Sequence, residues 1–428
     1  MKKMLALIVI MLLTVTLISC ISGGQKEGQL TVWWPGGSPA ERAAIDEAKR
    51  LYELENPDVT IRIVPQSTSN FYMDYMMSLN GNDFPDIAYV DHVYIQQLVY
   101  NGAIANLSDA GLDRLKSTYL DSLWLPNTYE GDLYALPFSA NVLVTVYNKT
   151  ILETVLNRAV TVNDIPNTFD ELLQISELIK QYNITNNLTG DNAITPYTLP
   201  AGTGSTSMGA MAYLSYVARL GGRIISDDLK TMRLNEGPSQ QAAQLIAQLG
   251  SLGYTPARFE EGRFESGKVA FIEMGPWKIV EYGRIATNRN IEFGYAPIIK
   301  LTENGTRESA LGLYSLVVTE KSINKELAID FIEFITTNDD LQILHNTAQS
   351  LMPTTKTAIE NEFYTGPIWA IYKEQLNHII ARPGSPEWAE MERQLGDFVT
   401  ALLNGTRTPD YVASLNFALQ RTLNELYS

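Results

Sequence analysis

The amino-acid sequence predicts an α/β protein in which a mostly parallel sheet is covered by helices. From residue 30 onward, β-rich segments alternate with segments of helical periodicity, and this order favours parallel strands. Apolar residues make up 45% of the chain and charged residues 19%, a balance typical of a large packed core. At 428 residues, the chain is long enough for two to three core-sized units.

An uncharged run precedes these elements. Lys2 and Lys3 form a short positive head, and residues 4–19 carry no charge. The run is shorter than the roughly 20 residues that span a membrane and has the length of a signal-peptide core. The alternative is a retained N-terminal anchor helix.

The only cysteine of the chain ends this run. Residues 17–20 read Leu-Ile-Ser-Cys, which resembles a bacterial lipobox with Cys20 as the lipidated residue. We therefore expect residues 1–19 to be a lipoprotein signal peptide and residues 20–29, rich in Gly, Ser and Gln, to be a flexible tether. The body would then lie in the cell envelope, anchored by lipid on the extracytoplasmic side, in a periplasm or at the cell surface.

The first part of the body follows a β-α-β-α-β order. Its first strand ends at Pro-Gly-Gly, and Pro39 occupies a tolerated first-turn position of the next helix. Apolar residues alternate with polar ones in the second strand, which predicts that it is half-buried. The expected strands are residues 30–34, 59–63 and 86–90, and the expected helices are residues 39–56, 70–79 and 92–100.

The remainder of the chain continues the alternation. The expected strands are residues 143–147, 269–272 and 315–318, and the expected helices are residues 169–182, 208–220, 240–249, 326–335 and 410–426. No long low-complexity linker divides the chain, so two lobes would be joined by several short crossings.

Charge and cysteine content exclude several functional classes. Acidic residues number 48 against 32 basic ones, a net charge of −16 that argues against nucleic-acid binding. One Cys and three His cannot build a Cys/His zinc cage or a disulfide framework. We expect neither a metal nor a cofactor.

Enzyme motifs are missing or incomplete. Residues 262–268 have P-loop spacing, but Val269 stands where a Ser or Thr must reach Mg²⁺, and a strand follows instead of a helix. The chain contains no Gly-x-Ser-x-Gly and no His-Glu-x-x-His. We therefore predict a polar turn at residues 262–268 and a protein that is not an enzyme.

Aromatic residues are the positive feature. The chain has 6 Trp, 22 Tyr and 13 Phe, most of which must be core. Trp33, Trp34, Trp277 and Tyr314 lie at breaks between predicted elements. In open α/β sheets the ligand crevice lies beyond the carboxyl ends of strands, and aromatic rings there suit the C–H face of a sugar.

Four local motifs support a family resemblance: residues 84–91 (Phe-Pro-Asp-Ile, then Asp), residues 133–149, residues 262–277 (Gly-Lys, a strand, then Gly-Pro-Trp) and residues 324–334. Their order resembles the bacterial extracellular solute-binding proteins, family 1, which are maltose- and trehalose-type sugar receptors of ABC importers. The resemblance covers nearly all of the chain after residue 30. It implies a type II periplasmic-binding-protein-like α/β fold, with the ligand in a cleft between two lobes.

The resemblance also implies how the chain is divided. The N-terminal lobe would hold residues 30–140 plus 293–338, and the C-terminal lobe residues 141–292 plus 339–428. The chain would cross between them near residues 139–141, 293 and 335–341. The closed form would dock on the membrane permease as a monomer.

Three side chains are the main candidates for the ligand site. The resemblance assigns Trp277 as the stacking ring and Asp91 as the acceptor of sugar hydroxyls. Asp91 could equally be a helix N-cap. Arg382, in Arg-Pro, would reach the ligand from the C-terminal helices or would form a surface salt bridge. His92 is expected to be a structural histidine.

Five further residues complete the expected site. They follow a glycine-rich turn, a strand end or a lobe return, and they are Ser38, Glu41, Asn141, Gly312 and Tyr314.

The implied function is that of a receptor binding a neutral sugar, from a monosaccharide to an oligosaccharide, with di- or oligosaccharides favoured. A receptor for a polyamine, phosphodiester or peptide is the first alternative. A surface glycoside hydrolase or lyase needs two opposed carboxylates that no local motif supplies. The last alternative is a lipoprotein scaffold that binds only proteins.

Overall fold

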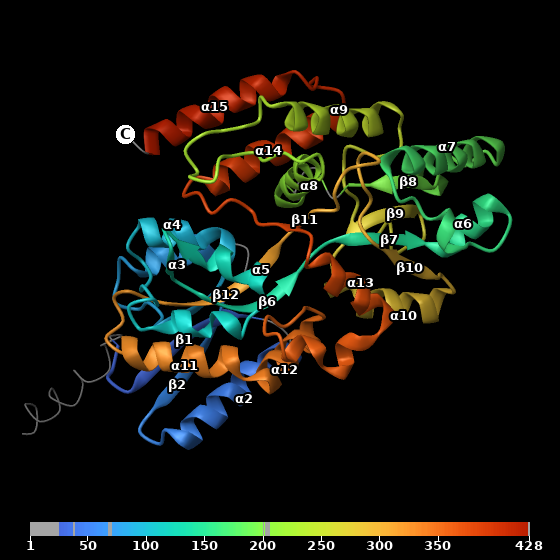
Figure 1. Ribbon diagram of the computed structural model, residues 1–428. Coiled ribbons are helices and arrows are strands. Elements are labelled where there is room, and N and C mark those ends of the chain that lie inside the picture. The colour runs from blue at the N-terminus through green and yellow to red at the C-terminus, as the bar shows by residue number, and fades with distance from the viewer. Residues whose placement is uncertain (1–24, 37–38, 67–70, 200, 202–205, 427–428) are drawn as a thin grey trace, which may run out of the picture.

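Two mixed sheets, each covered by helices on both faces, form the molecule (Figure 1). The computed structural model describes residues 25–36, 39–66, 71–199, 201 and 206–426. The predicted α/β class is confirmed by this architecture. Within the described ranges, no helix is long and apolar enough to cross a membrane.

The first sheet has the strand order β2-β1-β3-β12-β6. β1 pairs in parallel with both β2 and β3, whereas β12 is antiparallel to β3 and to β6. The prediction of a mostly parallel sheet is therefore wrong. Only half of the strand pairings in this sheet are parallel, because β12 runs antiparallel to both of its neighbours. The bounds are β1 Gln29–Pro35, β2 Thr60–Gln66, β3 Ile87–Asp91, β6 Leu136–Asn141 and β12 Gly312–Val318.

Helices cover this sheet on both faces. Successive side chains of a strand point to opposite faces. β1 accordingly sends Trp34 into the core under one helix group and Trp33 into the core under the other. Both tryptophans are thus structural. The first group is α2 (Pro39–Glu55), α11 (Lys325–Thr337) and α12 (Asp339–Gln349), and the second is α3 (Phe71–Ser78) and α4 (Ile95–Tyr100).

The second sheet has the strand order β10-β7-β9-β8. Only β8 and β9 pair in parallel. Its bounds are β7 Val144–Asn148, β8 Thr195–Thr198, β9 Val269–Met274 and β10 Phe293–Ala296. One face packs against α6 (Lys149–Leu156), α7 (Phe169–Thr185), α8 (Thr206–Arg219), α9 (Gly237–Ser251), α14 (Trp388–Leu403) and α15 (Tyr411–Leu426), and the other against α10 (Ile279–Arg289) and α13 (Pro367–Gln375).

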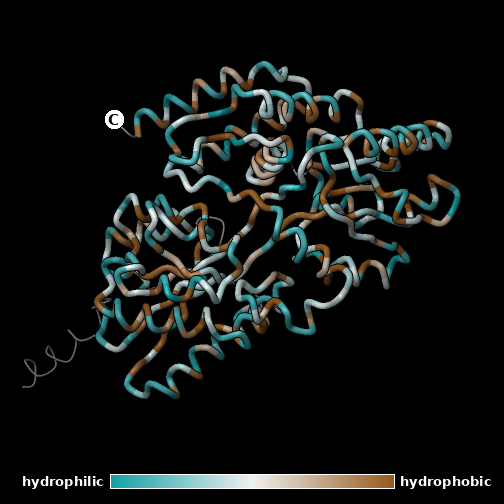
Figure 2. Tube along the Cα trace, in the orientation of Figure 1, coloured by the Kyte–Doolittle hydropathy of each residue, from teal (hydrophilic) through white to brown (hydrophobic). Residues whose placement is uncertain are grey.

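Hydropathy follows this layering. In Figure 2 the strands at the centre of each half carry mostly hydrophobic residues, whereas the outer helices alternate between hydrophobic and hydrophilic positions. β9 is buried along its whole length. The remaining short elements are α5 (Asp121–Trp124), β4 (Thr128–Tyr129) and β5 (Asp132–Leu133).

Three segments carry the chain between the sheets. Residues 142–143 join β6 to β7, residues 297–311 lead from β10 to β12, and residues 350–366 lead from α12 to α13. Within the second segment, β11 (Ser309–Ala310) pairs in parallel with β13 (Ile379–Ile380).

Two of these crossings lie later than expected. Phe293, expected to begin the return to the first lobe, starts β10, which pairs with β7 in the second sheet. The third crossing follows α12, because Leu341 of this helix is buried in the core beneath the first sheet. The expected boundaries at 293 and 338 therefore do not coincide with the change of sheet.

A close helix contact organises the second half. A Cβ placed on Gly250 of α9 would lie 2.3 Å from the backbone oxygen of Leu403 in α14. Gly209 of α8 meets Gly396 of α14 in the same way, with a Cβ-to-Cα distance of 3.3 Å. Small residues thus let α14 lie directly on its two neighbours.

A buried ion pair ties α8 to β9. Arg219 donates from Nη1 to Glu273 Oε1 at 2.9 Å and from Nη2 to Oε2 at 2.7 Å. Neither side chain is exposed by more than 2%. Bidentate charge-assisted bonds of this kind have a fixed geometry. The pair therefore holds the end of β9, from which Trp277 follows.

Candidate functional site

Four expected site residues gather at one edge of the first sheet. Asp91 ends β3 and is opposite Tyr314 in the β3–β12 register, and Gly312 is opposite Asn141 in the β12–β6 register. A Cβ on Gly312 would lie 2.3 Å from Asn141 Oδ1. The glycine therefore makes room for the Asn141 amide against the backbone of β12.

Asp91 and Arg382 pair with each other. Arg382 Nη2 donates to both carboxylate oxygens, at 2.6 and 2.7 Å, and Nε donates to the Leu311 carbonyl at 3.3 Å. Burial alone would raise the pKa of Asp91, but Arg382 and His92 hold it well below its usual range. Asp91 also caps a 3-10 helix, accepting from the Val93 N–H at 3.5 Å. Both oxygens of Asp91 are thus already engaged.

His92 supports this pair from within the protein. Its Nδ1 lies 3.0 Å from Asp91 Oδ1 and 3.2 Å from the Leu313 carbonyl oxygen. The ring is 2% exposed, and burial lowers its pKa. His92 is therefore a structural residue, as the sequence predicts.

Glu392 of α14 joins this group and was not predicted. Its Oε1 accepts from Ser207 Oγ at 2.8 Å and from Trp388 Nε1 at 3.3 Å, and lies 3.9 Å from Arg382 Nη1. Burial raises the pKa of Glu392. The one sequence signal was the i, i+4 spacing of Trp388 and Glu392, which puts both on one helix face.

A tyrosine pair lies where the two halves of the molecule meet. Tyr94, in the 3-10 helix His92–Tyr94, stacks on Tyr72 of α3 with ring centroids 5.0 Å apart. Tyr94 packs against the core of α3 and α4 and also against the helical core of the second half. On the first sheet, Tyr314 stacks on Tyr89 at 5.2 Å. Tyr94 and Tyr314 therefore lie near the Asp91–Arg382 pair, whose charges act on both hydroxyl groups.

Trp277 occupies a separate position. It lies in the 3-10 helix Pro276–Lys278, directly after β9, and is half-buried against the core on the α10 and α13 side of the second sheet. Its ring covers Gly275, where any Cβ would overlap it. Among the described residues, no hydrogen bond or ring contact joins Trp277 to Asp91, Arg382 or Glu392.

The other expected residues are only partly visible. Glu41 belongs to the first turn of α2, but its side chain lies outside the described part of the chain, as do Ser38 and Cys20. The P-loop-like segment forms a turn before β9, as expected. No group of three His, Cys, Asp or Glu side chains in the described ranges could hold a metal ion.

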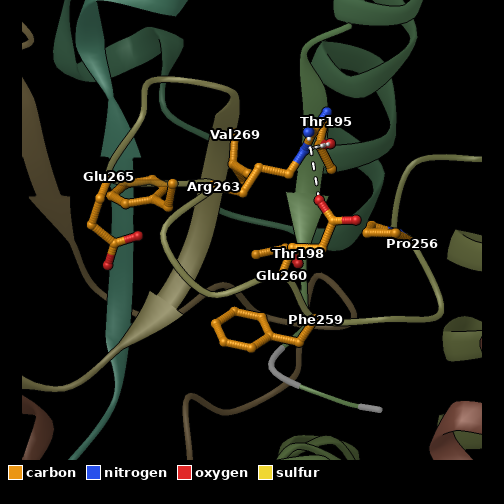
Figure 3. Close-up of a pocket in the computed structure, with 9 residues that line it drawn as sticks. Thr195, Thr198, Pro256, Phe259, Glu260, Arg263, Glu265 and Val269 are labelled. Carbon is orange, nitrogen blue, oxygen red and sulfur yellow. Dashed lines mark hydrogen bonds and ion pairs between the residues drawn. The ribbon is translucent and has the colours of Figure 1, made fainter. Parts of the chain in front are cut away.

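Two cavities lie away from these residues. Figure 3 shows a pocket beside β8 and β9 in which Arg263 reaches Thr195 and Glu260. Its volume of about 10 Å³ has room for a single water at most. A groove of about 450 Å³ runs along α14 and α15 between Arg393, Phe398, Arg407 and Tyr411.

The protein has two α/β halves that are joined by three crossings. Polar and aromatic side chains gather where the halves meet. This arrangement is that of a two-domain binding protein. The chain belongs to the bacterial extracellular solute-binding protein family, whose model matches residues 47–369.

Curated relatives extend over most of the chain. A maltotriose-binding protein of Pyrococcus abyssi is 21% identical over 395 residues, which cover 90% of this chain and 80% of the relative. A galactooligosaccharide-binding protein of Bacillus subtilis is 24% identical over 325 residues, 74% of this chain and 70% of the relative. These relatives are binding proteins by name, not enzymes.

Solved structures share the fold. The cyclic α-maltosyl-1,6-maltose binding protein of Arthrobacter globiformis superposes with a TM-score of 0.78 at 22% identity, covering 93% of this chain and 99% of its own. The sugar-binding protein MalE of Xanthomonas citri gives 0.78 at 17% identity, covering 93% and 98%. The two-lobed fold expected from the sequence is thereby confirmed.

Proposed function

We propose that the protein is an extracytoplasmic receptor that binds a neutral sugar of two or more units and delivers it to the permease of an ABC importer. The observation that carries this proposal is the match of 90% of the chain to a maltotriose-binding protein. The aromatic and charged side chains gathered where the halves meet supply the stacking and hydrogen bonding that a sugar needs.

Binding would act through closure of two lobes. We assign residues 29–141 and 312–349 to the first lobe and residues 144–296 and 367–426 to the second, following the two sheets. A ligand favours the closed state only through contacts that this state alone completes, so it must touch both lobes. Trp277 would contribute from the second lobe, and Asn141 and Tyr314 from the first. No covalent bond is made or broken when the ligand binds.

Calorimetric titration tests the proposal. Residues 21–428 would be titrated with maltotriose, a galactooligosaccharide, trehalose, spermidine and glycerol phosphate. We expect saturable binding of at least one sugar and no heat of turnover. Binding of spermidine or glycerol phosphate alone would overturn the sugar, and a steady heat of reaction would indicate a hydrolase. Sedimentation of the same sample checks the expected monomer.

The lipid anchor has its own experiment. We infer that Cys20 carries the lipid, because it is the only cysteine and follows an uncharged run. The Cys20→Ser variant should be lost from the membrane fraction and found in the soluble envelope or medium. Membrane retention of this variant would favour an uncleaved anchor helix.

A further inference from the structure

We propose that Glu392 binds a hydroxyl of the ligand directly, side by side with Nη1 of Arg382, and that Asp91 is a positioning residue that holds the Arg382 guanidinium. This inference rests on the proposed sugar-binding function. It reverses the expectation from sequence for Asp91 and adds a carboxylate, Glu392, that no motif indicated.

The guanidinium of Arg382 is only partly used by the protein. Its Nη2 bonds both oxygens of Asp91, and its Nε bonds the Leu311 carbonyl. The nearest acceptor described for Nη1 is Glu392 Oε1 at 3.9 Å, which is beyond hydrogen-bond distance. Among the described residues, no acceptor lies within hydrogen-bond distance of Nη1.

The carboxylate of Glu392 is likewise half used. Ser207 and Trp388 both donate to Oε1, whereas Oε2 accepts from none of the residues that the structure describes. The side chain keeps 19% of its surface exposed. The two contacts fix the carboxylate through Oε1, and no described residue donates to Oε2.

Donor and acceptor together match a sugar. A carboxylate oxygen only accepts and a guanidinium nitrogen only donates, whereas a hydroxyl does both. Neighbouring hydroxyls of a sugar ring can therefore give a hydrogen to Glu392 and take one from Arg382. Charge-assisted bonds of this kind are about twice as strong as neutral ones. Tyr94, which stacks on Tyr72, lies close enough to Glu392 and Arg382 to interact with their charges.

The arrangement of charges around Arg382 explains why Asp91 would not contact the ligand directly. Two carboxylates, Asp91 and Glu392, surround one guanidinium, and Asp91 takes both short bonds. A partly buried carboxylate without full pairing is unfavourable. A ligand hydroxyl at Glu392 would offset that cost, whereas one at Asp91 would displace an existing bond.

The experiment compares Glu392 with a neighbour on the same helix. The best sugar of the titration panel is measured with Glu392→Ala, Glu392→Gln and the control Glu390→Gln, whose carboxylate pairs with Arg393. We expect Glu392→Ala to weaken binding about 10- to 100-fold, the loss of a charged hydrogen bond. Glu392→Gln, which keeps an acceptor for Ser207 and Trp388, should lose less, and Glu390→Gln should match the wild type.

Monodeoxy analogues of that sugar separate contact from folding. The wild type and Asp91→Asn should both reject the analogue that lacks the hydroxyl bound by Glu392, although Asp91→Asn binds more weakly throughout. Glu392→Ala should bind that analogue and the parent sugar equally. If Glu392→Ala discriminates as the wild type does, the inference is overturned while the receptor stands. A wild type that binds no sugar overturns the proposed function as well.

Discussion

At the scale of single residues, Trp277 depends on the glycine before it. Its ring lies over Gly275 and remains half-buried, so it has a fixed position and an accessible face. We expect Trp277→Ala to weaken sugar binding by about 30-fold or more, the effect of removing an aromatic anchor of about 2 kcal/mol. Titration calorimetry measures this loss.

A second tryptophan serves as the control for folding. Trp369 of α13 is 7% exposed in the same core. Trp369→Ala should lower the free energy of unfolding by about 3–5 kcal/mol, as large core truncations do. Trp277→Ala should lose clearly less in the same urea titration. Unchanged affinity in Trp277→Ala would remove this ring from the ligand site.

His345 makes stability depend on pH. It is fully buried among Trp34, Phe138 and Tyr89, and burial lowers its pKa from 6.5 to about 3. Below pH 6.5 the unfolded chain binds a proton that the folded chain refuses, so stability falls as the pH decreases from 6.5 to 3. The contribution is at most about 1.4 kcal/mol per pH unit. In urea titrations at several pH values, His345→Gln should show a shallower loss, and an identical slope would contradict this account.

The family resemblance named Asp91, Tyr314 and Arg382 as candidate ligand residues, and the structure brings Asp91 into contact with Arg382 and into register with Tyr314. The pairing of Asp91 with Arg382 could not be predicted, because it joins residues almost 300 positions apart. Glu392 was missed because nothing local distinguishes it from the other acids of α14.

At the scale of elements, the α9–α14 contact depends on Gly250. An added methyl group would meet the backbone of Leu403, which cannot rotate away. Gly250→Ala should lower the free energy of unfolding by about 1–3 kcal/mol or more, as overpacking does. Gly283→Ala is the matched control, because nothing lies within 4 Å of its Cβ in α10. That variant should be stabilised by about 0.5–1 kcal/mol. Equal melting temperatures for the two variants would contradict this contact.

Strong periodicity made most elements predictable. The alternation in β2 and the helical spacing in α7, α11 and α15 gave elements close to those found. The direction of β12 could not be predicted, because it depends on where the chain returns from the second sheet. The predicted helices do not include α6, α10, α12, α13 and α14.

At the scale of the whole molecule, three crossings join the two halves, and the proposed function requires the halves to rotate toward each other. We expect a saturating sugar to reduce the radius of gyration in small-angle X-ray scattering, because hinge closure brings the lobes together. Trp277→Ala at the same sugar concentration should keep the unliganded value. A wild-type radius that does not change at saturation would argue against closure.

The central place of β12 also bears on biosynthesis. β12 lies between β3 and β6, yet it is made about 170 residues after β6, once the strands of the second sheet have already been synthesised. When only the N-terminal third of the chain has been synthesised, the first sheet still lacks β12 and cannot be complete. The nascent chain must therefore stay without a complete first core until β12, α11 and α12, up to residue 349, have emerged. Such a delay suits a polypeptide that is threaded through a translocation pore before it folds.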